Sequence, residues 1–141
     1  MKIERVTEAS PDVVEGLARL LPQLSAGREA PTAGQVAEIA RDTTLLVARG
    51  DDGAIVGTLT LVLTRLPSGF KGRIEDVIVD EAARGQGLGE RLTEEAMRLA
   101  AEAGARSVEL TSSPRREAAN RLYRRLGFEQ RETNVYVWRP R

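Results

Sequence analysis

The stretch V-I-V-D-E-A-A-R-G-Q-G-L-G-E-R-L, from Val77 to Leu92, decides how the chain is organised. It begins with three β-branched residues, which are typical of a strand, and it ends in the first residues of a helical pattern. Between them, Arg84 to Gly89 forms a short loop that contains three glycines. A glycine-rich loop that leads into a helix N-terminus directs backbone N–H groups and partial positive charge toward one point. The stretch therefore predicts a site for a phosphate or pyrophosphate group.

The composition limits the chemistry that such a site can serve. The chain has 141 residues, of which 41% are hydrophobic and 30% charged, and this is typical of one globular domain. It has no cysteine and no histidine, which excludes thiol nucleophiles, disulfides, Ser-His-Asp triads and Cys/His zinc sites. Acid–base chemistry must then come from Asp, Glu, Tyr, Lys or water.

The charge and hydropathy of the chain indicate its surroundings. The net charge is zero, which argues against a general nucleic-acid-binding protein because such a protein needs a basic excess. No apolar run approaches the length of a membrane span, and the N-terminus lacks an apolar signal segment. We therefore expect a cytoplasmic protein that binds neither nucleic acid nor membrane.

Hydrophobic periodicity predicts an α/β chain of the α+β type, in the order β-α-α-β-β-β-α-β-α-β(β). The first half should form a strand, two helices and an antiparallel meander, over residues 2–7, 11–21, 32–41, 43–49, 55–66 and 72–80, with a loop from Pro22 to Pro31. The second half should form a helix, a strand parallel to the one before it, a further helix that begins at Ser113–Pro114 and stops at Gly127, and one or two final strands, over residues 88–103, 106–111, 113–126 and 128–138.

Other readings of the glycine loop fit the sequence less well. A P-loop needs a lysine after its glycines, and none follows here. A dinucleotide-binding fold places its glycines after the first strand of a parallel array, whereas these follow three strands that we expect to be antiparallel. A helix entry without a ligand is disfavoured, because each glycine costs about 1 kcal/mol if it is helical.

Two motifs in this order resemble those of the GNAT superfamily of acetyl-CoA-dependent N-acetyltransferases. The run V-I-V-x-x-x-x-R-G-x-G-x-G is similar to the family's acetyl-CoA signature, and L-Y-x-x-L-G-F, from Leu122 to Phe128, resembles its second signature. The element order matches as well, and the resemblance covers essentially the whole chain. It implies one N-acetyltransferase domain over residues 1–141, with a mixed central sheet of six to seven strands, about four helices and a splayed parallel strand pair that binds the cofactor.

The resemblance also implies roles for particular residues. The backbone groups that hold the acetyl and pantetheine portions of acetyl-CoA would be those of Val77, Ile78 and Val79. The backbone groups that hold its pyrophosphate would be those of Arg84, Gly85, Gln86, Gly87, Leu88, Gly89 and Glu90. Tyr123 matches the family's usual general acid, which protonates the CoA thiolate; the alternative is a tyrosine that only packs in the core.

Glu75 and Asp76 are the candidate general bases, because charged residues are otherwise unfavourable in the middle of a strand. Side chains alternate along a strand, so only one of the two should face the substrate unless a bulge intervenes. The alternative is a solvated strand edge or an ion pair with Arg73. The run G-x-I-E-D-V-x-V-D is similar to that of the hexosamine-phosphate acetyltransferases of the superfamily, but it is short.

The helix after Pro114 departs from the family pattern. Many members have an Asn seven residues before the Tyr, and this chain has Arg116 there, while Asn120 lies three residues before it. Both share a helical face with Tyr123. The expectation is that Asn120 binds the pantetheine amides or that Arg116 binds a phosphate.

These features predict an enzyme that transfers the acetyl group of acetyl-CoA to a primary amine by direct attack on the thioester, without a metal. The acceptor, a small molecule or a peptide, is not identified by the sequence. The alternative is a non-catalytic domain on the same fold that binds or senses acyl-CoA. The apolar segment Val135–Trp138 suggests a strand that pairs across a homodimer.

Overall fold

The computed structural model describes all residues from 1 to 141. The chain divides into two compact units, residues 1–110 and residues 111–141. The elements of the first unit are β1 (Lys2–Arg5), α1 (Pro11–Leu24), α2 (Ala33–Asp42), β2 (Thr44–Arg49), β3 (Ile55–Leu66), β4 (Gly69–Val79), the short 3₁₀ helix η1 (Glu81–Ala83), α3 (Leu88–Glu102) and β5 (Val108–Glu109). The second unit contains α4 (Glu117–Arg125).

One mixed sheet forms the centre of the first unit, with its strands in the order β1-β2-β3-β4-β5. The pairs β1–β2, β2–β3 and β3–β4 are antiparallel, and the pair β4–β5 is parallel. The predicted meander and the predicted parallel strand are therefore confirmed. None of the helices is long and apolar enough to cross a membrane.

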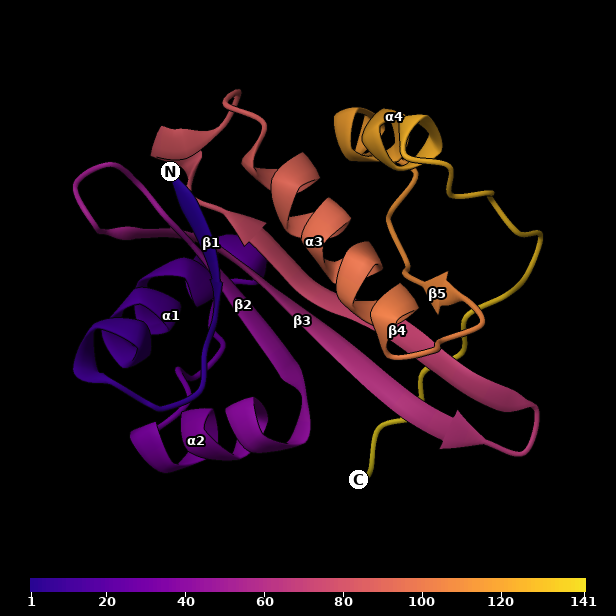
Figure 1. Ribbon diagram of the computed structural model, residues 1–141, viewed down its shortest axis with the longest axis horizontal. Coiled ribbons are helices and arrows are strands. Elements are labelled where there is room, and N and C mark those ends of the chain that lie inside the picture. Colours follow the sequence, from indigo (N-terminus) through magenta and orange to yellow (C-terminus); the bar gives the residue numbers. More distant parts are fainter. The chain divides into compact units, whose positions relative to one another are not determined.

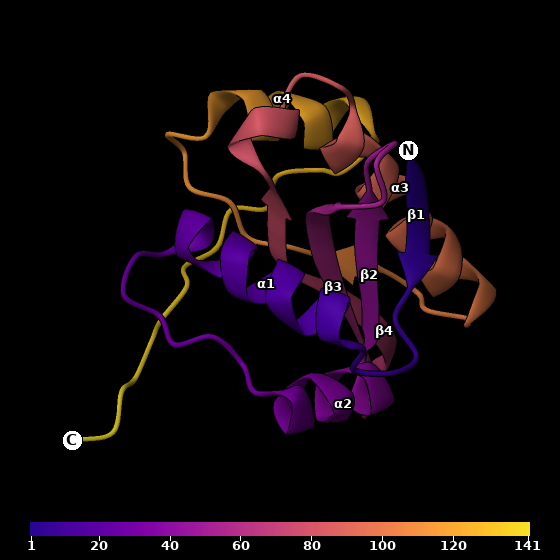
Figure 2. The same ribbon diagram turned by 90° about the vertical axis from the view of Figure 1, so that its left-hand side faces the viewer.

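Helices cover both faces of this sheet, as Figures 1 and 2 show: α1 and α2 lie on one face and α3 lies on the other. Leu45 and Val47 of β2 belong to the buried cluster that contains residues of α1 and α2. The alternate positions face α3, where an added Cβ on Gly57 of β3 would lie 3.3 Å from Leu92 Cδ1. Side chains alternate between the two faces of the sheet, and helices cover both faces. Both sets of β2 side chains are therefore buried, so β2 is buried along almost its whole length.

The helix α1 continues past the proline at which the sequence predicts its end. Pro22 lies inside α1, which ends only at Leu24, so the predicted loop from Pro22 to Pro31 begins three residues too early. A proline in a helix interior removes a hydrogen bond and costs about 3 kcal/mol. The last turn of α1 must therefore be stabilised by contacts outside the helix. The helix α2 agrees with the prediction within one residue and begins with a capping box between Thr32 and Gln35.

The sheet has five strands, and the prediction of six to seven is wrong. Residues 128–138, which the sequence assigns to one or two final strands, contain no strand (Figure 1). Val135 to Trp138 have the composition of a strand, but their side chains are 65–88% exposed. A strand needs a neighbouring strand for its backbone hydrogen bonds, and composition alone does not provide one.

The helix α4 begins three residues later than predicted. Its N-cap is Arg116, and the Ser113 hydroxyl instead accepts a hydrogen bond from the Arg115 N–H at 3.3 Å, which belongs to the turn before the helix. The predicted stop at Gly127 is confirmed. Gly127 has a φ of 98°, and the Phe128 N–H donates to the Tyr123 carbonyl at 2.9 Å, as at other helix ends with a left-handed glycine.

Candidate functional site

A bulge interrupts β4 where the sequence places the two acidic residues. Thr58 of β3 pairs with Ile78, and Thr60 pairs with Glu75. One residue of β3 between these pairs therefore faces two residues of β4, Asp76 and Val77. Asp76 has a φ of 51°, and it is the one non-glycine residue of the chain with a positive φ. The bulge that the alternation argument allowed for is present.

The bulge determines the side of the sheet on which Glu75 lies. Cross-strand partners share a face, so Glu75 lies with Thr60 and with its β2 partner Leu45, on the face that α1 and α2 cover. The Glu75 carboxylate pairs with the Arg73 guanidinium, two positions earlier on the same face. Asp76 is exposed at the bulge itself. Glu75 therefore forms the ion pair with Arg73 that the sequence allows, and it also lies on the face of the sheet that α1 and α2 cover.

The edge of β4 that faces β5 is open beyond the first few residues. β5 pairs only with Gly72 and Arg73. The Asp80 N–H donates to Val56 of β3 at 2.8 Å. Since backbone groups alternate in direction along a strand, those of Val79 point away from β3. The Val79 carbonyl accepts a hydrogen bond from Arg84 Nε at 3.1 Å.

The glycine loop joins this edge to the N-terminus of α3. Gly85 and Gly87 have φ values of 82° and 77°, which only glycine adopts without strain. Gly87 is the N-cap, and the first helical hydrogen bond runs from the Arg91 N–H to its carbonyl at 3.0 Å. The N–H groups at the very start of α3 therefore precede the helical hydrogen-bond ladder. An added Cβ on Gly85 or Gly87 would meet no atom within 4 Å, so the space beside the loop is open. An anion fits this arrangement.

Asp80 introduces the loop, although the sequence assigns it to the end of the strand. Its carboxylate accepts a hydrogen bond from the Ala82 N–H at 3.2 Å and so caps η1. This hydrogen bond, followed by the one from Arg19, holds the pKa of Asp80 below its usual range. The signal in the sequence is an Asp directly before Glu81, Ala82 and Ala83, which is an ordinary N-cap pattern.

Tyr123 lies in α4 of the second unit. Its side chain is buried, and its ring meets that of Phe128 edge to face, with the ring centroids 5.8 Å apart. Burial raises the pKa of the Tyr123 hydroxyl, and the charge of Arg116 partly opposes this effect. The phenol therefore stays protonated at neutral pH, which is the state that a general acid requires.

The two polar residues upstream of Tyr123 take part in the local structure of the second unit. Asn120 Nδ2 donates to the Ser113 carbonyl at 3.0 Å, which ties α4 to the turn before it. The Arg116 N–H donates to the same carbonyl at 3.0 Å, and Arg116 is exposed. The structure therefore gives Asn120 a structural contact, and the binding of cofactor groups by Asn120 and Arg116 stays a prediction.

The first unit brings together most of the residues that the sequence predicts for the site. They are Glu75, Asp76, Val77, Ile78 and Val79 on β4, and Arg84, Gly85, Gln86, Gly87, Leu88, Gly89 and Glu90 between β4 and the first turn of α3. Tyr123, Arg116 and Asn120 belong to the second unit, and their roles stay predictions.

Comparison with known proteins agrees with this geometry. The model of the acetyltransferase (GNAT) family matches residues 16–128. A rice protein (Oryza sativa subsp. japonica) named probable glucosamine 6-phosphate N-acetyltransferase 2 is 33% identical over 123 residues, which cover 83% of this chain and 72% of that protein.

Solved structures give the same result. The crystal structure of glucosamine-6-phosphate N-acetyltransferase from Arabidopsis thaliana has a TM-score of 0.81 and 26% identity, with 97% of each chain covered. That of a Trypanosoma brucei acetyltransferase has a TM-score of 0.79 and 27% identity, and covers 96% of this chain and 97% of the other. The open β4 edge, the glycine loop and these relatives together identify the chain as a member of the GNAT family of acetyltransferases.

Proposed function

We propose that this acetyltransferase transfers the acetyl group of acetyl-CoA directly to a primary amine, and that residues 1–141 act as one catalytic domain. The observation that carries the proposal is the continuous path from the open edge of β4 to the N-terminus of α3. Backbone groups at Val77 and Val79 are suited to an extended amide chain such as pantetheine. The helix N-terminus at Gly87 is suited to the pyrophosphate at the other end.

The proposed acid–base roles rest on the face of β4 that Glu75 occupies and on the burial of Tyr123. Glu75, on the face covered by α1 and α2, takes the proton that the amine loses as its nitrogen attacks the thioester carbonyl. A backbone N–H at the strand end stabilises the negative charge that develops on the carbonyl oxygen. The C–S bond then breaks, and Tyr123, which burial keeps protonated, gives its proton to the CoA thiolate.

The first acceptor class to test is an amino-sugar phosphate. The curated rice relative carries the name of a glucosamine 6-phosphate N-acetyltransferase. On this chain, Lys71 and Arg73 alternate with Glu75 on one face of β4, opposite Thr64 and Val62. Arg73, which pairs with the proposed base, and Lys71, further along the same face, are suited to an acceptor that carries a phosphate as well as an amine.

The experiment that tests the proposal measures the release of free CoA thiol from acetyl-CoA in the presence of amines. The panel contains an amino-sugar phosphate, the same sugar without phosphate, amino acids and short peptides. Thiol release that depends on one acceptor class supports the proposal, and a lower KM for the phosphorylated sugar supports the acceptor class. Tight binding of acetyl-CoA without turnover for any amine would favour the alternative, a non-catalytic acyl-CoA-binding or sensing domain.

The exposed segment Val135–Trp138 leads us to propose a homodimer as well. Four consecutive apolar side chains, 65–88% exposed, form an unusual surface for a monomer. Their β-branched and aromatic composition is suited to strand pairing with a second copy. Sedimentation of the wild-type chain and of a Tyr136→Lys, Trp138→Lys variant tests this: the variant should be monomeric, and a monomeric wild type would refute the dimer.

A further inference from the structure

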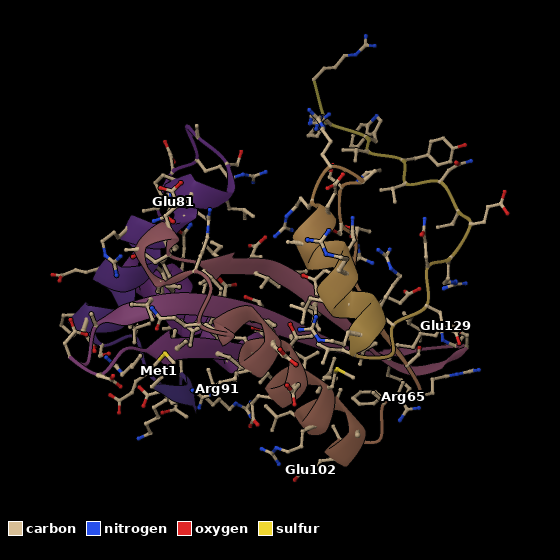
Figure 3. All side chains as sticks on the ribbon, turned by 90° about the horizontal axis from the view of Figure 1, so that it is seen from above. Met1, Arg65, Glu81, Arg91, Glu102 and Glu129 are labelled. Carbon is tan, nitrogen blue, oxygen red and sulfur yellow. The ribbon has the colours of Figure 1, made fainter.

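Two side chains of α1 hold the segment that leads into the glycine loop. Arg19 Nη1 donates to Asp80 Oδ2 at 2.5 Å, and Arg19 Nη2 donates to the Ile55 carbonyl at the start of β3. Gln23 Oε1 accepts a hydrogen bond from the Glu81 N–H at 3.0 Å. Figure 3 shows Glu81 at the turn after β4, beside α1. Both the carboxylate and the backbone of this turn are therefore bound to a helix more than fifty positions earlier in the chain.

The path of α1 gives independent support for this contact. The helix continues for a last turn beyond Pro22, although the proline removes a hydrogen bond from that turn. Gln23 lies in this turn, and its amide is within 3.5 Å of Asp80 Oδ1 as well as bonded to Glu81. The contact with the loop is thus one of the interactions that offset the unfavourable proline.

Hydrogen bonds within the same segment also depend on the position of Asp80. Asp80 Oδ1 accepts from the Ala82 N–H at 3.2 Å, and the Ala83 N–H donates to the Asp80 carbonyl at 2.8 Å. Arg84 follows immediately and begins the glycine loop. The orientation of Asp80 therefore affects the geometry of the loop that begins four positions later.

We infer that Arg19 and Gln23 are positioning residues for the pyrophosphate loop, so that α1 helps to set the affinity for acetyl-CoA. The inference rests on the proposed function, since it assigns the loop to acetyl-CoA. A loop with two left-handed glycines loses much conformational entropy when it is ordered. A turn that is already anchored reduces the part of this loss that falls on ligand binding. Loss of the anchor should then weaken binding more than it slows the chemical step.

The experiment compares Arg19→Met, Arg19→Lys and Gln23→Ala with wild type by calorimetric titration of CoA and by steady-state kinetics. We expect Arg19→Met and Gln23→Ala to raise the Kd for CoA and the KM for acetyl-CoA about threefold to tenfold, with kcat within about twofold. Arg19→Lys keeps a charge for Asp80 and should recover part of the loss. Arg41→Met on α2 is the control, because Arg41 pairs only with its neighbour Asp42, and it should bind CoA like wild type.

A double-mutant cycle separates positioning from charge. Asp80→Asn keeps an oxygen for the Ala82 N–H and loses the ion pair with Arg19. If the two residues act through one contact, Arg19→Met and Asp80→Asn together should weaken CoA binding no more than either alone. Full recovery of affinity in the double variant would show a charge effect on the ligand and would overturn the positioning role.

A second readout keeps the inference separate from the proposed function. Amide hydrogen exchange of residues 80–84, measured without ligand, should be faster in Arg19→Met than in wild type. Unchanged exchange there, or an unchanged Kd for CoA in both Arg19→Met and Gln23→Ala, would overturn the inference while wild type still binds CoA. Failure of wild type to bind CoA would overturn the proposed function and the inference together.

Discussion

Gly16 of α1 lies directly against Ile55 of β3: a Cβ placed on Gly16 would be 2.9 Å from the Ile55 Cβ, closer than side chains pack. Gly16→Ala should therefore destabilise the protein by about 1–3 kcal/mol, because neither backbone can move away cheaply. Gly34 of α2 is the matched control, since its nearest atom would be 3.9 Å away. Gly34→Ala should stabilise by about 0.5–1 kcal/mol through helix propensity. Urea unfolding of the two variants measures both effects, and equal stability would contradict the close contact.

The side of the sheet on which Glu75 lies predicts which acid is the base. Glu75→Gln should lower kcat/KM about a hundredfold, within the usual range for a general base. Asp76→Asn should change it by less than about threefold, because an amide keeps the size of the side chain at an exposed bulge position. Thiol-release kinetics at saturating acetyl-CoA measure both. The reverse order of effects would assign the base to Asp76.

The raised pKa of the Tyr123 hydroxyl predicts how activity and stability depend on pH. Burial raises the pKa of its hydroxyl above the ordinary value of 10.0, so the acid should remain protonated throughout the neutral range. The stability that comes from the buried neutral phenol is present below the ordinary pKa and is lost as the pH rises through the higher folded-state value.

Tyr123→Phe should accordingly lower kcat about a hundredfold, the usual range for loss of a general acid, and change affinity for CoA little. Tyr136→Phe is the control, because the Tyr136 side chain is 88% exposed. Activity should show no alkaline limb from this group below pH 10.0 in the wild type. Full activity of Tyr123→Phe would leave the tyrosine as a packing residue.

The glycine loop offers a matched pair of substitutions. Gly87 and Gly53, in the turn between β2 and β3, have φ values of 77° and 85°, and a Cβ on either would meet no atom within 4 Å. Alanine at either position should cost about 1–2 kcal/mol of stability for its left-handed backbone. Only Gly87→Ala should also raise the Kd for CoA, by about tenfold or more, since its methyl group would occupy the space beside the phosphate site. Equal CoA binding by both variants would argue against the loop as the anion site.

A network around Arg49 predicts loss of stability in acid. The Arg49 guanidinium pairs with Glu4 and with Asp12 and so joins β2 to β1 and to α1. Its hydrogen bond to Glu4 holds the pKa of that carboxyl below the ordinary 4.5. The resulting stability is present above pH 4.5 and is lost as the pH falls through the lower folded-state pKa. Denaturant unfolding between pH 3 and pH 6 should show a smaller change with pH for Arg49→Met than for wild type.

The sequence predicts the first unit well because its signals are local. Periodicity, the capping box at Thr32 and the glycines in the loop each depend on residues a few positions apart. The glycine loop in particular needs a left-handed backbone at Gly87, and this requirement is visible in the residue type itself.

One error comes from a contact between distant segments, and the others come from the geometry of a local turn and from a strand-like segment without a partner. The extra turn of α1 after Pro22 depends on Gln23 meeting Glu81, fifty-eight positions later. The later start of α4 depends on which nearby donors reach Ser113. The final strands were predicted from composition at Val135–Trp138, where no partner strand is present. Neither Arg19 nor Gln23 carries a sequence signal for a loop that lies so far along the chain.

The bulge at Asp76 adds one residue to β4 without changing the partners of the residues on either side of it. Asp76 and Val77 both lie opposite Leu59, so removal of Asp76 would leave Val77 opposite Leu59 and Glu75 opposite Thr60. The side chains from Gly69 to Glu75 would keep their faces. Loss of one residue from the regular part of the strand, between Gly72 and Glu75, would instead turn the residues before it to the opposite face. A variant library of this protein should therefore retain deletion of Asp76 and lose single deletions between Gly72 and Glu75.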